Sequence, residues 1–419
     1  MTSKVWDVLV IGAGPGGSAA AAFLAEAGFS VLVLDRDHFP RFHIGESLLP
    51  SGAAVLNKLG IAPDPDVFLD KMGAQFVCDA TDRVAEFDFS LALPGPPRHA
   101  WQVERASFDT ILAENAKARG ATLKFGVRVR DFEIDDTGVT LTTDDESYRG
   151  RYLIDASGQH RFIATKKRAV LPYPDFGRAA VFTHFHEIRD EVWDGVIGPN
   201  FDIRIMMIED GWIWVIPLAG KRLSVGVVSR RRGIKDEWLD EYISKSKRLS
   251  EWLRGARREE QTHIIANFSY RNAEAFGVRY ACIGDAWCFL DPVFSSGANL
   301  ALRSADSLCQ HLIPALKENR EDAADLTTEH ERYMQRAIDT FSALIFRFYH
   351  TNIVDNLIFD VPPDGDLRAN ITSVFAGDVF RYDNAFQEML LHSHIRPVPG
   401  ESLLQDGVYQ RPRRKIPAS

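Results

Sequence analysis

A glycine-rich turn near the start of the chain has the residue types and spacing that bind a dinucleotide. Gly12, Gly14 and Gly17 form a GxGxxG pattern directly after an apolar run that ends at Ile11. In such a turn the first glycine permits a tight bend, the second lets the backbone approach a pyrophosphate, and the third brings helix and strand together. Free N–H groups at the start of the next helix then bind the phosphates. The pattern predicts a site for FAD or NAD, between which the glycines do not discriminate.

An acidic residue completes this dinucleotide pattern. Asp35 ends a second β-rich run and lies 18 residues after Gly17, where its carboxylate can hold a ribose hydroxyl. We therefore expect the cofactor to lie between the glycine turn and this acid. The other residues predicted to contact it here are Ala13, Gly16 and Arg36.

Three elements must position these residues. The apolar run 8–11 predicts a strand, and the small residues of 18–27 predict a helix, which Gly28 is placed to end. The run 30–35 predicts a second strand, and strand, helix and strand together form the nucleotide-binding unit of a Rossmann-like α/β fold. The uncharged stretch 8–25 approaches the length of a membrane span, but four glycines and a proline interrupt it. We therefore expect no membrane association.

A polar loop and a lysine follow this unit. The loop 40–50 carries Glu46 and Ser47, and a short helix is expected to start near Ser47, whose hydroxyl could cap it. Loops of this kind often reach a bound nucleotide. Lys71 lies in an apolar, β-leaning stretch, 67–76, and on its residues alone such a lysine is normally a solvated strand residue.

An unusual aromatic strand is predicted at 211–217, which reads Gly-Trp-Ile-Trp-Val-Ile-Pro. Alternation places Trp212, Trp214 and Ile216 on one face, and Pro217 ends the run. Aromatic residues favour sheets, so these residues also suit an ordinary core strand. Beside a cofactor, however, such rings would separate it from an organic substrate.

Two strand ends and one helix start offer further cofactor contacts. The strands 152–155 and 280–283 each end at Gly and Asp residues, as ordinary turns also do. The loop 290–299 leads into a long helix, 300–316, and the free N–H groups at the start of this helix suit an anion. The positions concerned are Asp155, Gly284, Asp285, Ser296, Gly297 and Ala298.

Composition excludes several classes of protein. The formal net charge of −9 argues against general nucleic-acid binding. The four cysteines, Cys78, Cys282, Cys288 and Cys309, show no CxxC spacing and no accompanying histidine cluster. This pattern favours reduced thiols in a cytoplasmic protein without a metal site.

The rest of the chain predicts a β-rich middle and a helical end. A helix is expected at 106–119, and an antiparallel ribbon is expected to follow it. The charged segment 235–258 has helical spacing, and its charges suit a solvated face. A less favoured interpretation is that they bind an acidic carrier protein. The other predicted elements are ribbon strands at 122–125, 127–134 and 139–142, strands at 179–186, 201–208, 212–216 and 223–228, and helices at 329–348, 370–379 and 384–392.

The motifs together resemble one family. Besides the glycine turn, the blocks are Gly-Glu-Ser-Leu-Leu-Pro at 45–50, Lys-x-Gly-Ala-x-Phe at 71–76 and Trp-x-Trp-x-Ile-Pro at 212–217. They resemble the flavin-dependent halogenase branch of the FAD monooxygenase superfamily, with all blocks in the expected order. The resemblance implies an α/β (α+β) fold of the p-hydroxybenzoate-hydroxylase type. Its implied parts are a discontinuous FAD-binding domain (1–65, 98–165 and 276–325), an inserted, mainly antiparallel β substrate region (66–97 and 166–275) and a helical C-terminal region (326–419).

The resemblance also assigns roles to residues. It makes Lys71 the catalytic residue, and it makes Trp212, Trp214, Ile216 and Pro217 the wall of a tunnel beside the flavin. Ser296 and Gly297 would hold a halide, and the cofactor would be FAD. The implied FAD contacts outside the glycine turn are Glu46, Ser47, Gln102, Arg105, Val129, Asp155, Gly284, Asp285, Gly297 and Ala298.

The implied reaction uses reduced FAD, dioxygen and chloride or bromide. A flavin C4a-hydroperoxide would oxidise the halide to hypohalous acid, which Lys71 would bind as a haloamine or by hydrogen bonding. Because no second nucleotide fingerprint is found, a separate flavin reductase is expected to supply reduced FAD. Phe294 stands where tryptophan halogenases have a glutamate. That difference favours an electron-rich phenol or pyrrole, free or tethered to a carrier protein, in natural-product biosynthesis.

Two other functions remain open at this stage. One is a monooxygenase or a prenyl-chain reductase of the same fold, which would form its product without a halide. The other is a flavin-binding protein without catalysis. Halide-dependent product formation separates both from a halogenase.

Overall fold

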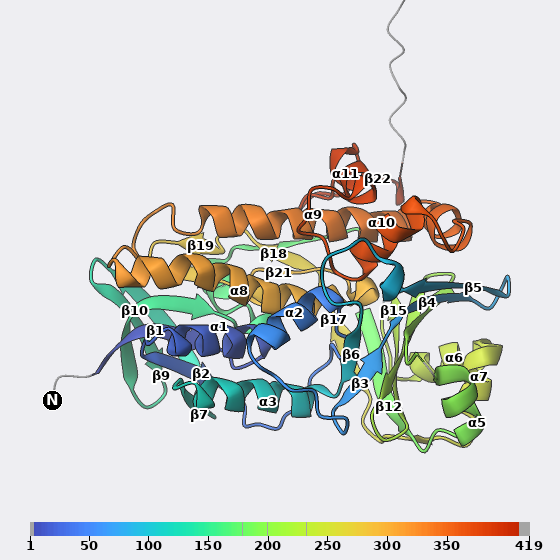
Figure 1. Cartoon of the computed structure of the whole chain (residues 1–419), viewed down its shortest axis with the longest axis horizontal. Coiled ribbons are helices and arrows are strands. Elements are labelled where there is room, and N and C mark those ends of the chain that lie inside the picture. Colours follow the sequence, from blue (N-terminus) through green and yellow to red (C-terminus); the bar gives the residue numbers. More distant parts are fainter. Residues whose placement is uncertain (1–3, 178, 199, 232, 410–419) are drawn as a thin grey trace, which may run out of the picture.

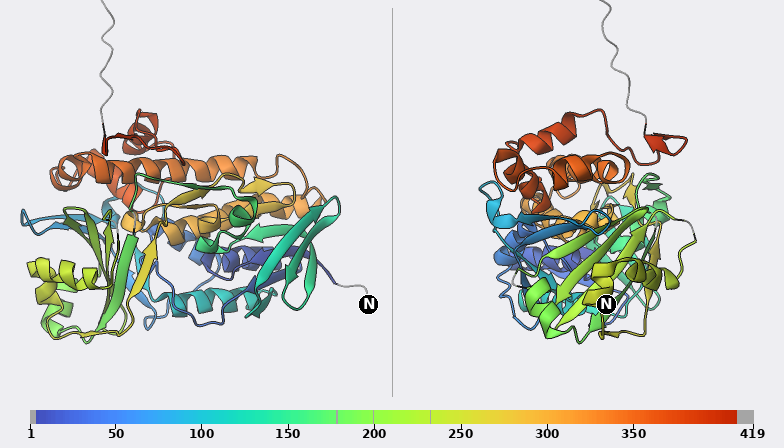
Figure 2. Two further views of the ribbon diagram at one scale, coloured as in Figure 1. Left: turned by 180° about the vertical axis from the view of Figure 1, so that it is seen from behind. Right: turned by 90° about the vertical axis from the view of Figure 1, so that its right-hand side faces the viewer.

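Two large sheets lie side by side, and a layer of helices covers them (Figure 1). The structure is a computed structural model that describes residues 4–177, 179–198, 200–231 and 233–409. Figure 2 shows the same arrangement from behind and from one end. The mixed α/β fold expected from the sequence is confirmed.

The first sheet contains the predicted nucleotide-binding unit. Strand β1 (Val5–Ile11) pairs in parallel with β2 (Val31–Asp35) on one side and with β10 (Ser147–Asp155) on the other. Helix α1 (Pro15–Glu26) joins β1 to β2 and starts earlier than predicted, because a proline suits the first turn of a helix. The strand order of the sheet is β19-β20-β10-β1-β2-β7.

The predicted three-stranded ribbon is wrong in one strand. Strands β8 (Val129–Asp135) and β9 (Gly138–Thr143) do form an antiparallel ribbon, which continues from β10. Strand β7 (Thr122–Phe125), however, pairs in parallel with β2. The helix that precedes it, α3 (Arg105–Ala118), carries the chain back along the sheet, and a helical crossover produces parallel pairing.

The second sheet is mainly antiparallel and faces the cavity described below. Its order is β16-β12-β15-β14-β13-β4-β5, and β17 also pairs with β12. Helices cover its other face (Figure 1), where Trp238, Leu239 and Leu249 pack with Ile213 and Val215. The alternation predicted for the aromatic strand is therefore confirmed.

The predicted helix 235–258 is broken in two. Helix α6 (Glu237–Lys245) ends before Ser246, whose extended backbone interrupts the helical hydrogen bonds. The hydroxyl of Ser246 then accepts a hydrogen bond from the N–H of Leu249, at 3.1 Å, and caps α7 (Lys247–Trp252).

Near the lysine, the predicted β-leaning stretch is confirmed, whereas the predicted helix start is wrong. The stretch 67–76 forms two strands, β3 (Phe68–Lys71) and β4 (Gly73–Cys78), in different sheets. Ser47 does not start a helix, because α2 (Pro50–Lys58) begins three residues later. The Ser47 hydroxyl instead accepts a hydrogen bond from Lys71.

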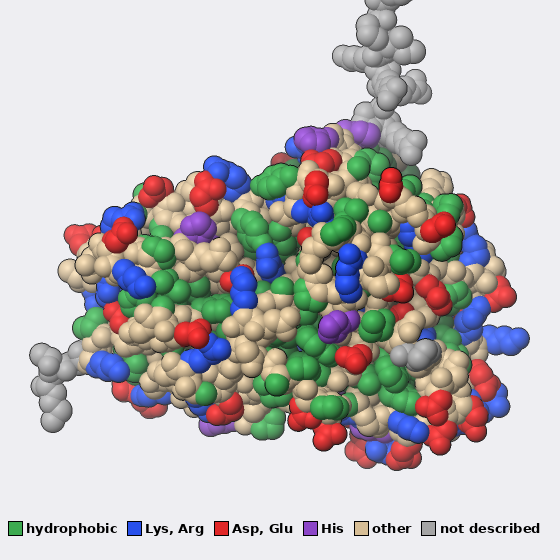
Figure 3. Space-filling view, in the orientation of Figure 1, with side chains coloured by type: hydrophobic (Ala, Val, Ile, Leu, Met, Phe, Trp, Pro, Cys, Tyr) green, Lys and Arg blue, Asp and Glu red, His purple; other side chains and the backbone are tan. Residues whose placement is uncertain are grey.

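The C-terminal part is helical, as predicted, and closes the molecule over both sheets. Helix α9 (Thr328–His350) runs along the upper side of the molecule above α8 (Ser296–Lys317), as Figures 1 and 2 show. Residues 410–419 of the predicted C-terminal region lie outside the described residues. Among the helices that are described, none is long and apolar enough to cross a bilayer. Acidic and basic side chains are interspersed on the face shown in Figure 3.

The remaining elements complete the layers. The other strands are β5 (Arg83–Asp88), β6 (Ala100–Val103), β11 (Val170–Pro172), β12 (Ala179–His186), β13 (Ile203–Ile208), β14 (Gly211–Leu218), β15 (Arg222–Ser229), β16 (Arg257–Arg258), β17 (His263–Ala266), β18 (Tyr270–Asn272), β19 (Phe276–Gly277), β20 (Tyr280–Cys282), β21 (Cys288–Phe289), β22 (Leu404–Gln405) and β23 (Val408–Tyr409). The other helices are α4 (Phe162–Lys167), α5 (Asp190–Val192), α10 (Asp366–Phe375) and α11 (Ala385–His392), with short turns η1 (Phe89–Leu91), η2 (Gly158–His160), η3 (Trp193–Ile197), η4 (Gly284–Ala286), η5 (Pro292–Phe294) and η6 (Val354–Phe359).

Candidate active site

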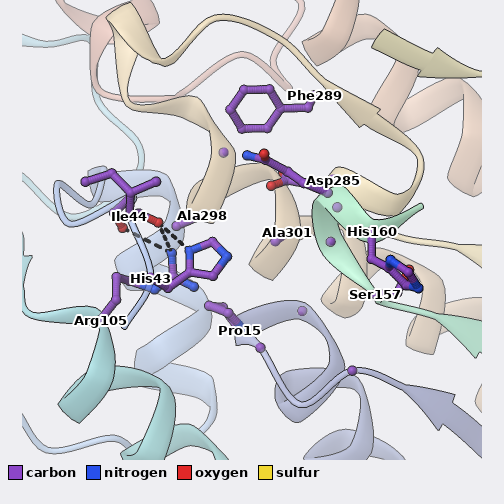
Figure 4. Close-up of a pocket in the computed structure, with 18 of the residues that line it drawn as sticks. Pro15, His43, Ile44, Arg105, Ser157, His160, Asp285, Phe289, Ala298 and Ala301 are labelled. Atoms are coloured by element: carbon purple, nitrogen blue, oxygen red, sulfur yellow. Dashed lines mark hydrogen bonds between the residues drawn. The ribbon is translucent and has the colours of Figure 1, made fainter. Parts of the chain in front are cut away.

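A cavity of about 350 Å³ lies between the two sheets, and most of the predicted cofactor residues line it. Side chains converge on it from α1, α3, α8 and the turns after β10 and β20 (Figure 4). The predicted residues that line it are Gly12, Gly14, Gly16, Asp35, Arg36, Glu46, Ser47, Arg105, Val129, Trp212, Trp214, Ile216, Gly284, Asp285, Ser296, Gly297 and Ala298.

The glycine turn is shaped by close backbone contacts. Gly12 has a φ of +96°, and a Cβ there would lie 2.4 Å from the carbonyl oxygen of Ala156. A Cβ on Gly17 would lie 1.9 Å from the carbonyl oxygen of Gly12, so helix and strand meet as predicted. Asp35 fixes the turn, because its carboxylate accepts the N–H of Ala13 at 2.7 Å.

Besides Lys71, five predicted site residues do not line the cavity, and three of them support it from behind. Ala13 and Gly17 form the turn itself, as described above. Asp155 is buried and accepts the N–H groups of Ser157 and Ile163, at 3.0 and 2.8 Å. It therefore holds in place the loop that follows β10, part of which lines the cavity.

The other two residues outside the cavity lie in the second layer of packing. The Gln102 side chain is buried and donates a hydrogen bond to the carbonyl of Phe201 at 3.0 Å. Pro217 falls on the opposite face of β14 from Trp212, Trp214 and Ile216. The cofactor contact of Gln102 and the place of Pro217 in the tunnel wall remain predictions.

Arg105 and Asp285 bring charge to the cavity. The guanidinium of Arg105 binds both oxygens of Asp109, at 2.7 and 3.0 Å, and donates to the carbonyl of Ile44 at 2.7 Å (Figure 4). Burial raises the pKa of Asp285 to about 7, although the charge of Arg105 acts in the opposite direction. Asp285 can therefore bind a cofactor hydroxyl as donor or as acceptor near neutral pH.

The tryptophan pair of β14 forms one wall of the cavity. The two rings lie 5.8 Å apart, centroid to centroid, and both are buried. Trp212 donates to the hydroxyl of Tyr349 at 3.0 Å, which donates in turn to Asp291 at 2.7 Å. Trp214 donates to the hydroxyl of Ser224 at 3.2 Å. These hydrogen bonds fix both rings in place.

Lys71 is entirely buried, with an exposed fraction of 0%. Its amine donates to the hydroxyl of Ser47 at 2.8 Å and to the carbonyl of Leu48 at 2.9 Å. Burial lowers the pKa of Lys71 to about 7, while the charge of Asp202 acts in the opposite direction. At neutral pH, a large fraction of this amine is uncharged.

A second, much smaller cavity of about 10 Å³ adjoins the amine of Lys71. Aromatic side chains enclose it, among them Phe76, Phe294 and Phe375. Ile203 and Ser295 line both this cavity and the large one. Lys71 therefore lies beside a small cavity that shares two lining residues with the large one.

Helix α8 begins directly after one of these shared residues. Ser295, the residue before its first turn, has a φ of +54° and makes no side-chain cap to the helix among the described residues. The first N–H groups of the helix thus have no such partner, and Ser296, Gly297 and Ala298 line the large cavity. Such a helix start suits an anion.

Comparisons with known proteins agree with this geometry. The family model for tryptophan halogenase matches residues 91–359, and the model for FAD dependent oxidoreductase matches residues 7–166. A pyrrole-2-carbonyl-carrier-protein brominase from Pseudoalteromonas luteoviolacea is 32% identical over 73% of this chain and 78% of its own length. The chain belongs to the flavin-dependent halogenases.

Other relatives support this assignment over more of the chain. A pyrrole-2-carbonyl-carrier-protein chlorinase from Pseudomonas fluorescens is 28% identical over 91% of both chains. The structure of the flavin-dependent brominase Bmp2 has a TM-score of 0.82 and 25% identity, covering 92% of this chain and 97% of that one. A flavoprotein/dehydrogenase structure from Cytophaga hutchinsonii has the same TM-score and 29% identity, covering 93% and 96%.

The cavity of this halogenase fits FAD. No side chain projects from Gly12, Gly14 or Gly16, so a pyrophosphate can approach the start of α1. The second carboxylate oxygen of Glu46 is buried and makes no hydrogen bond within the described part of the chain. A bound group would satisfy such an atom.

His43 is among the cavity residues that were not predicted from the sequence. His43 lines the cavity, and its Nδ1 lies 2.6 Å from the carbonyl of Ile44 (Figure 4). Because a carbonyl accepts hydrogen bonds, Nδ1 carries the proton and Nε2 is left as an acceptor. Burial and the charge of Arg105 lower the pKa of His43 to about 4. Its place next to the 45–50 block was the sequence signal that could have identified it.

The burial of Lys71 predicts a pH-dependent stability for the halogenase. Its pKa is about 7 in the folded protein and near 10.5 in the unfolded chain, so the unfolded chain holds the extra proton between these values. Relative to Lys71→Met, the wild type should gain up to about 1.4 kcal/mol of unfolding free energy per pH unit as pH rises through this window. Below the folded pKa of about 7, Lys71 is charged in both states, so the destabilisation that its burial causes no longer changes with pH. Urea denaturation of both proteins across this range measures the difference, and a constant difference would contradict the prediction.

Proposed function

We propose that this enzyme chlorinates or brominates a pyrrole ring held on a carrier protein, and that Lys71 transfers the halogen to the ring. One observation carries the proposal. The buried amine of Lys71 adjoins a small aromatic cavity that shares Ile203 and Ser295 with the large cavity. A small oxidant can therefore be made at one place and used at another.

The large cavity is where the halide would be oxidised. Reduced FAD, supplied by a separate flavin reductase, would reduce dioxygen to the peroxide level, and this oxidant would take two electrons from the halide to give hypohalous acid. The glycine turn, Asp35 and Arg105 would hold the cofactor. The first turn of α8 would hold chloride or bromide through the amides of Ser296 and Gly297, which line this cavity.

The tryptophan wall would exclude the organic substrate. Trp212 and Trp214 are fixed by hydrogen bonds to Tyr349 and Ser224 and fill one side of the cavity. Hypohalous acid is far smaller than an aromatic ring, and the boundary at Ser295 is where it would pass. The wall therefore favours halogenation over direct oxygen transfer to the substrate.

The hydrogen bonds of Lys71 support a haloamine. An uncharged amine has two N–H donors, and Ser47 and Leu48 offer two acceptors. The lone pair can then attack the halogen: an N–X bond forms, the HO–X bond breaks, and the released hydroxide takes an amine proton to form water. The ring carbon next attacks the halogen, the N–X bond breaks, and the ring proton returns to the amine.

The proposed acceptor rests on the cavity lining and on two relatives. Phe294 lines the small cavity beside Lys71, and no carboxylate is among its described lining residues. A ring that reached the amine would gain no activation from a carboxylate there, so it would have to be electron-rich itself. The relatives at 32% and 28% identity are named for pyrrole-2-carbonyl groups on a carrier protein.

The test is a reaction with pyrrole-2-carbonyl carrier protein, reduced FAD, a flavin reductase and dioxygen. We expect a product whose mass shows the isotope doublet of chlorine or bromine, according to the halide supplied. Omitting halide and using free pyrrole-2-carboxylic acid are the controls. An oxygenated product without halide would instead indicate a monooxygenase. Tight FAD binding with no product from any acceptor would contradict halogenation.

A further inference from the structure

Acidic and imidazole side chains form a path from the large cavity to the protein surface, with one step of 3.7 Å that is longer than a hydrogen bond. Glu46 lines the cavity, and its Oε1 lies 2.7 Å from Nε2 of His184. The other ring nitrogen of His184, Nδ1, lies 3.7 Å from Oε1 of Glu259. The Glu259 side chain is 33% exposed, and the same oxygen lies 2.7 Å from Nε2 of His186. Both ring nitrogens of His184 thus face carboxylates, one at the cavity and one at the solvent.

The fold holds this path in place. Glu46 lies in the loop that also carries Ser47, while His184 lies on β12 in the second sheet. The N–H of Glu259 donates to the carbonyl of His184 at 2.9 Å, which places the carboxylate beside the ring. The path therefore joins the FAD side of the molecule to the edge of the second sheet.

The surrounding charges keep His184 protonatable. Burial lowers the pKa of His184, but the hydrogen bond and charge of Glu46 and the charge of Glu259 outweigh it, and the pKa is raised overall. Arg222 acts in the opposite direction and is itself paired with Glu104 at 3.1 Å. Two further ionisable rings lie near this group: His263, which stacks on Phe42 beside the cavity, and His186, which contacts Glu259.

The overall reaction needs a proton from solvent. Reduced FAD, dioxygen, one halide ion, one proton and one aromatic C–H become oxidised FAD, one aromatic C–X and two water molecules. Dioxygen accepts two electrons from reduced FAD and two from the halide. Of the four protons in the two waters, two come from reduced FAD and one from the ring. The fourth must reach a cavity that bound FAD fills.

We propose that Glu46, His184 and Glu259 form the relay that delivers this proton, an inference that rests on the halogenation proposed above. Glu259 exchanges protons with solvent and passes one to Nδ1 of His184, across a gap that one water molecule or a side-chain rotation closes. The proton on Nε2 moves to Oε1 of Glu46, which releases it into the cavity. Imidazole is suited to this step because it takes a proton at one nitrogen and releases one from the other.

The test compares two relay variants with two exposed controls. His184→Asn removes the central ring, and Glu259→Gln changes the half-exposed outer group without altering its size. The matched controls are His392→Asn and Glu187→Gln, whose side chains are exposed and lie outside the relay. FAD affinity, halogenation rate against pH, and rate against imidazole concentration are measured for each protein.

We expect the relay variants to bind FAD as the wild type does but to halogenate at least about tenfold more slowly. The wild-type rate should fall as pH rises through the pKa of His184, and His184→Asn should lack this decrease. Added imidazole should restore part of its rate, which it would not do for a packing defect. In FAD-free protein, NMR titration should show a lower His184 pKa in Glu259→Gln than in the wild type.

Two distinguishable outcomes would contradict the relay: one leaves the proposed function intact, and the other does not. Wild-type rates and pH profiles in both relay variants would show that the proton enters by another route, while halogenation itself stands. A wild type that forms no halide-dependent product from any acceptor would contradict the proposed function and remove the need for this proton.

Discussion

Lys71→Met should abolish halogenation while leaving FAD binding intact, with a loss of at least about a hundredfold in product formation. The side chain is fully buried, and its amine bonds Ser47 and Leu48 beside the small cavity. Methionine fills a similar volume but offers no amine to take the halogen. Lys71 does not line the large cavity, although its hydrogen-bond partner Ser47 does, so FAD affinity should stay close to that of the wild type.

Two measurements separate the role of Lys71 from a folding defect. FAD affinity tests the integrity of the large cavity, and an added scavenger traps any oxidised halide that escapes. In Lys71→Met we expect continued halide oxidation without ring halogenation. Lys245→Met, at an exposed lysine that pairs with Glu241, is the matched control and should behave as the wild type. Ring halogenation at the wild-type rate in Lys71→Met would exclude the proposed transfer.

Gly12→Ala should weaken FAD binding by about a hundredfold or more, which corresponds to at least about 2.7 kcal/mol. An added Cβ would lie 2.4 Å from the carbonyl oxygen of Ala156 and 3.2 Å from Cα of Ser157. The backbone there has a φ of +96°, which side chains other than glycine rarely adopt. Two backbone segments that meet at the cavity would therefore have to separate.

Titration of FAD fluorescence measures this affinity, and thermal unfolding reports any general loss of stability. The matched control is Gly195→Ala, because Gly195 has open space around its Cβ position and no positive φ. Its FAD affinity should equal that of the wild type. Unchanged affinity in Gly12→Ala would show that the turn does not hold the pyrophosphate.

The sequence predicted the elements that depend on local spacing. The glycine turn and Asp35 follow from a short βαβ pattern, and the structure places both beside one cavity. Trp212 and Trp214 share a face because side chains alternate along a strand, wherever that strand is packed. The positions where helices end were less predictable. Ser246 divides a segment of even helical spacing, since its backbone is extended and its hydroxyl caps the second helix.

The sequence alone predicted a dinucleotide site, and by resemblance it predicted a flavin-dependent halogenase. Only the tertiary structure decided which side chains are buried together. Lys71 has the local pattern of a solvated strand residue, yet it is buried because β3 pairs with β6 and the Ser47 loop covers its amine. Glu46 and His184 are 138 residues apart, and their contact depends on how one sheet packs against the loops of the other. Local patterns constrain backbone conformation, whereas such pairs form only when distant segments fold together.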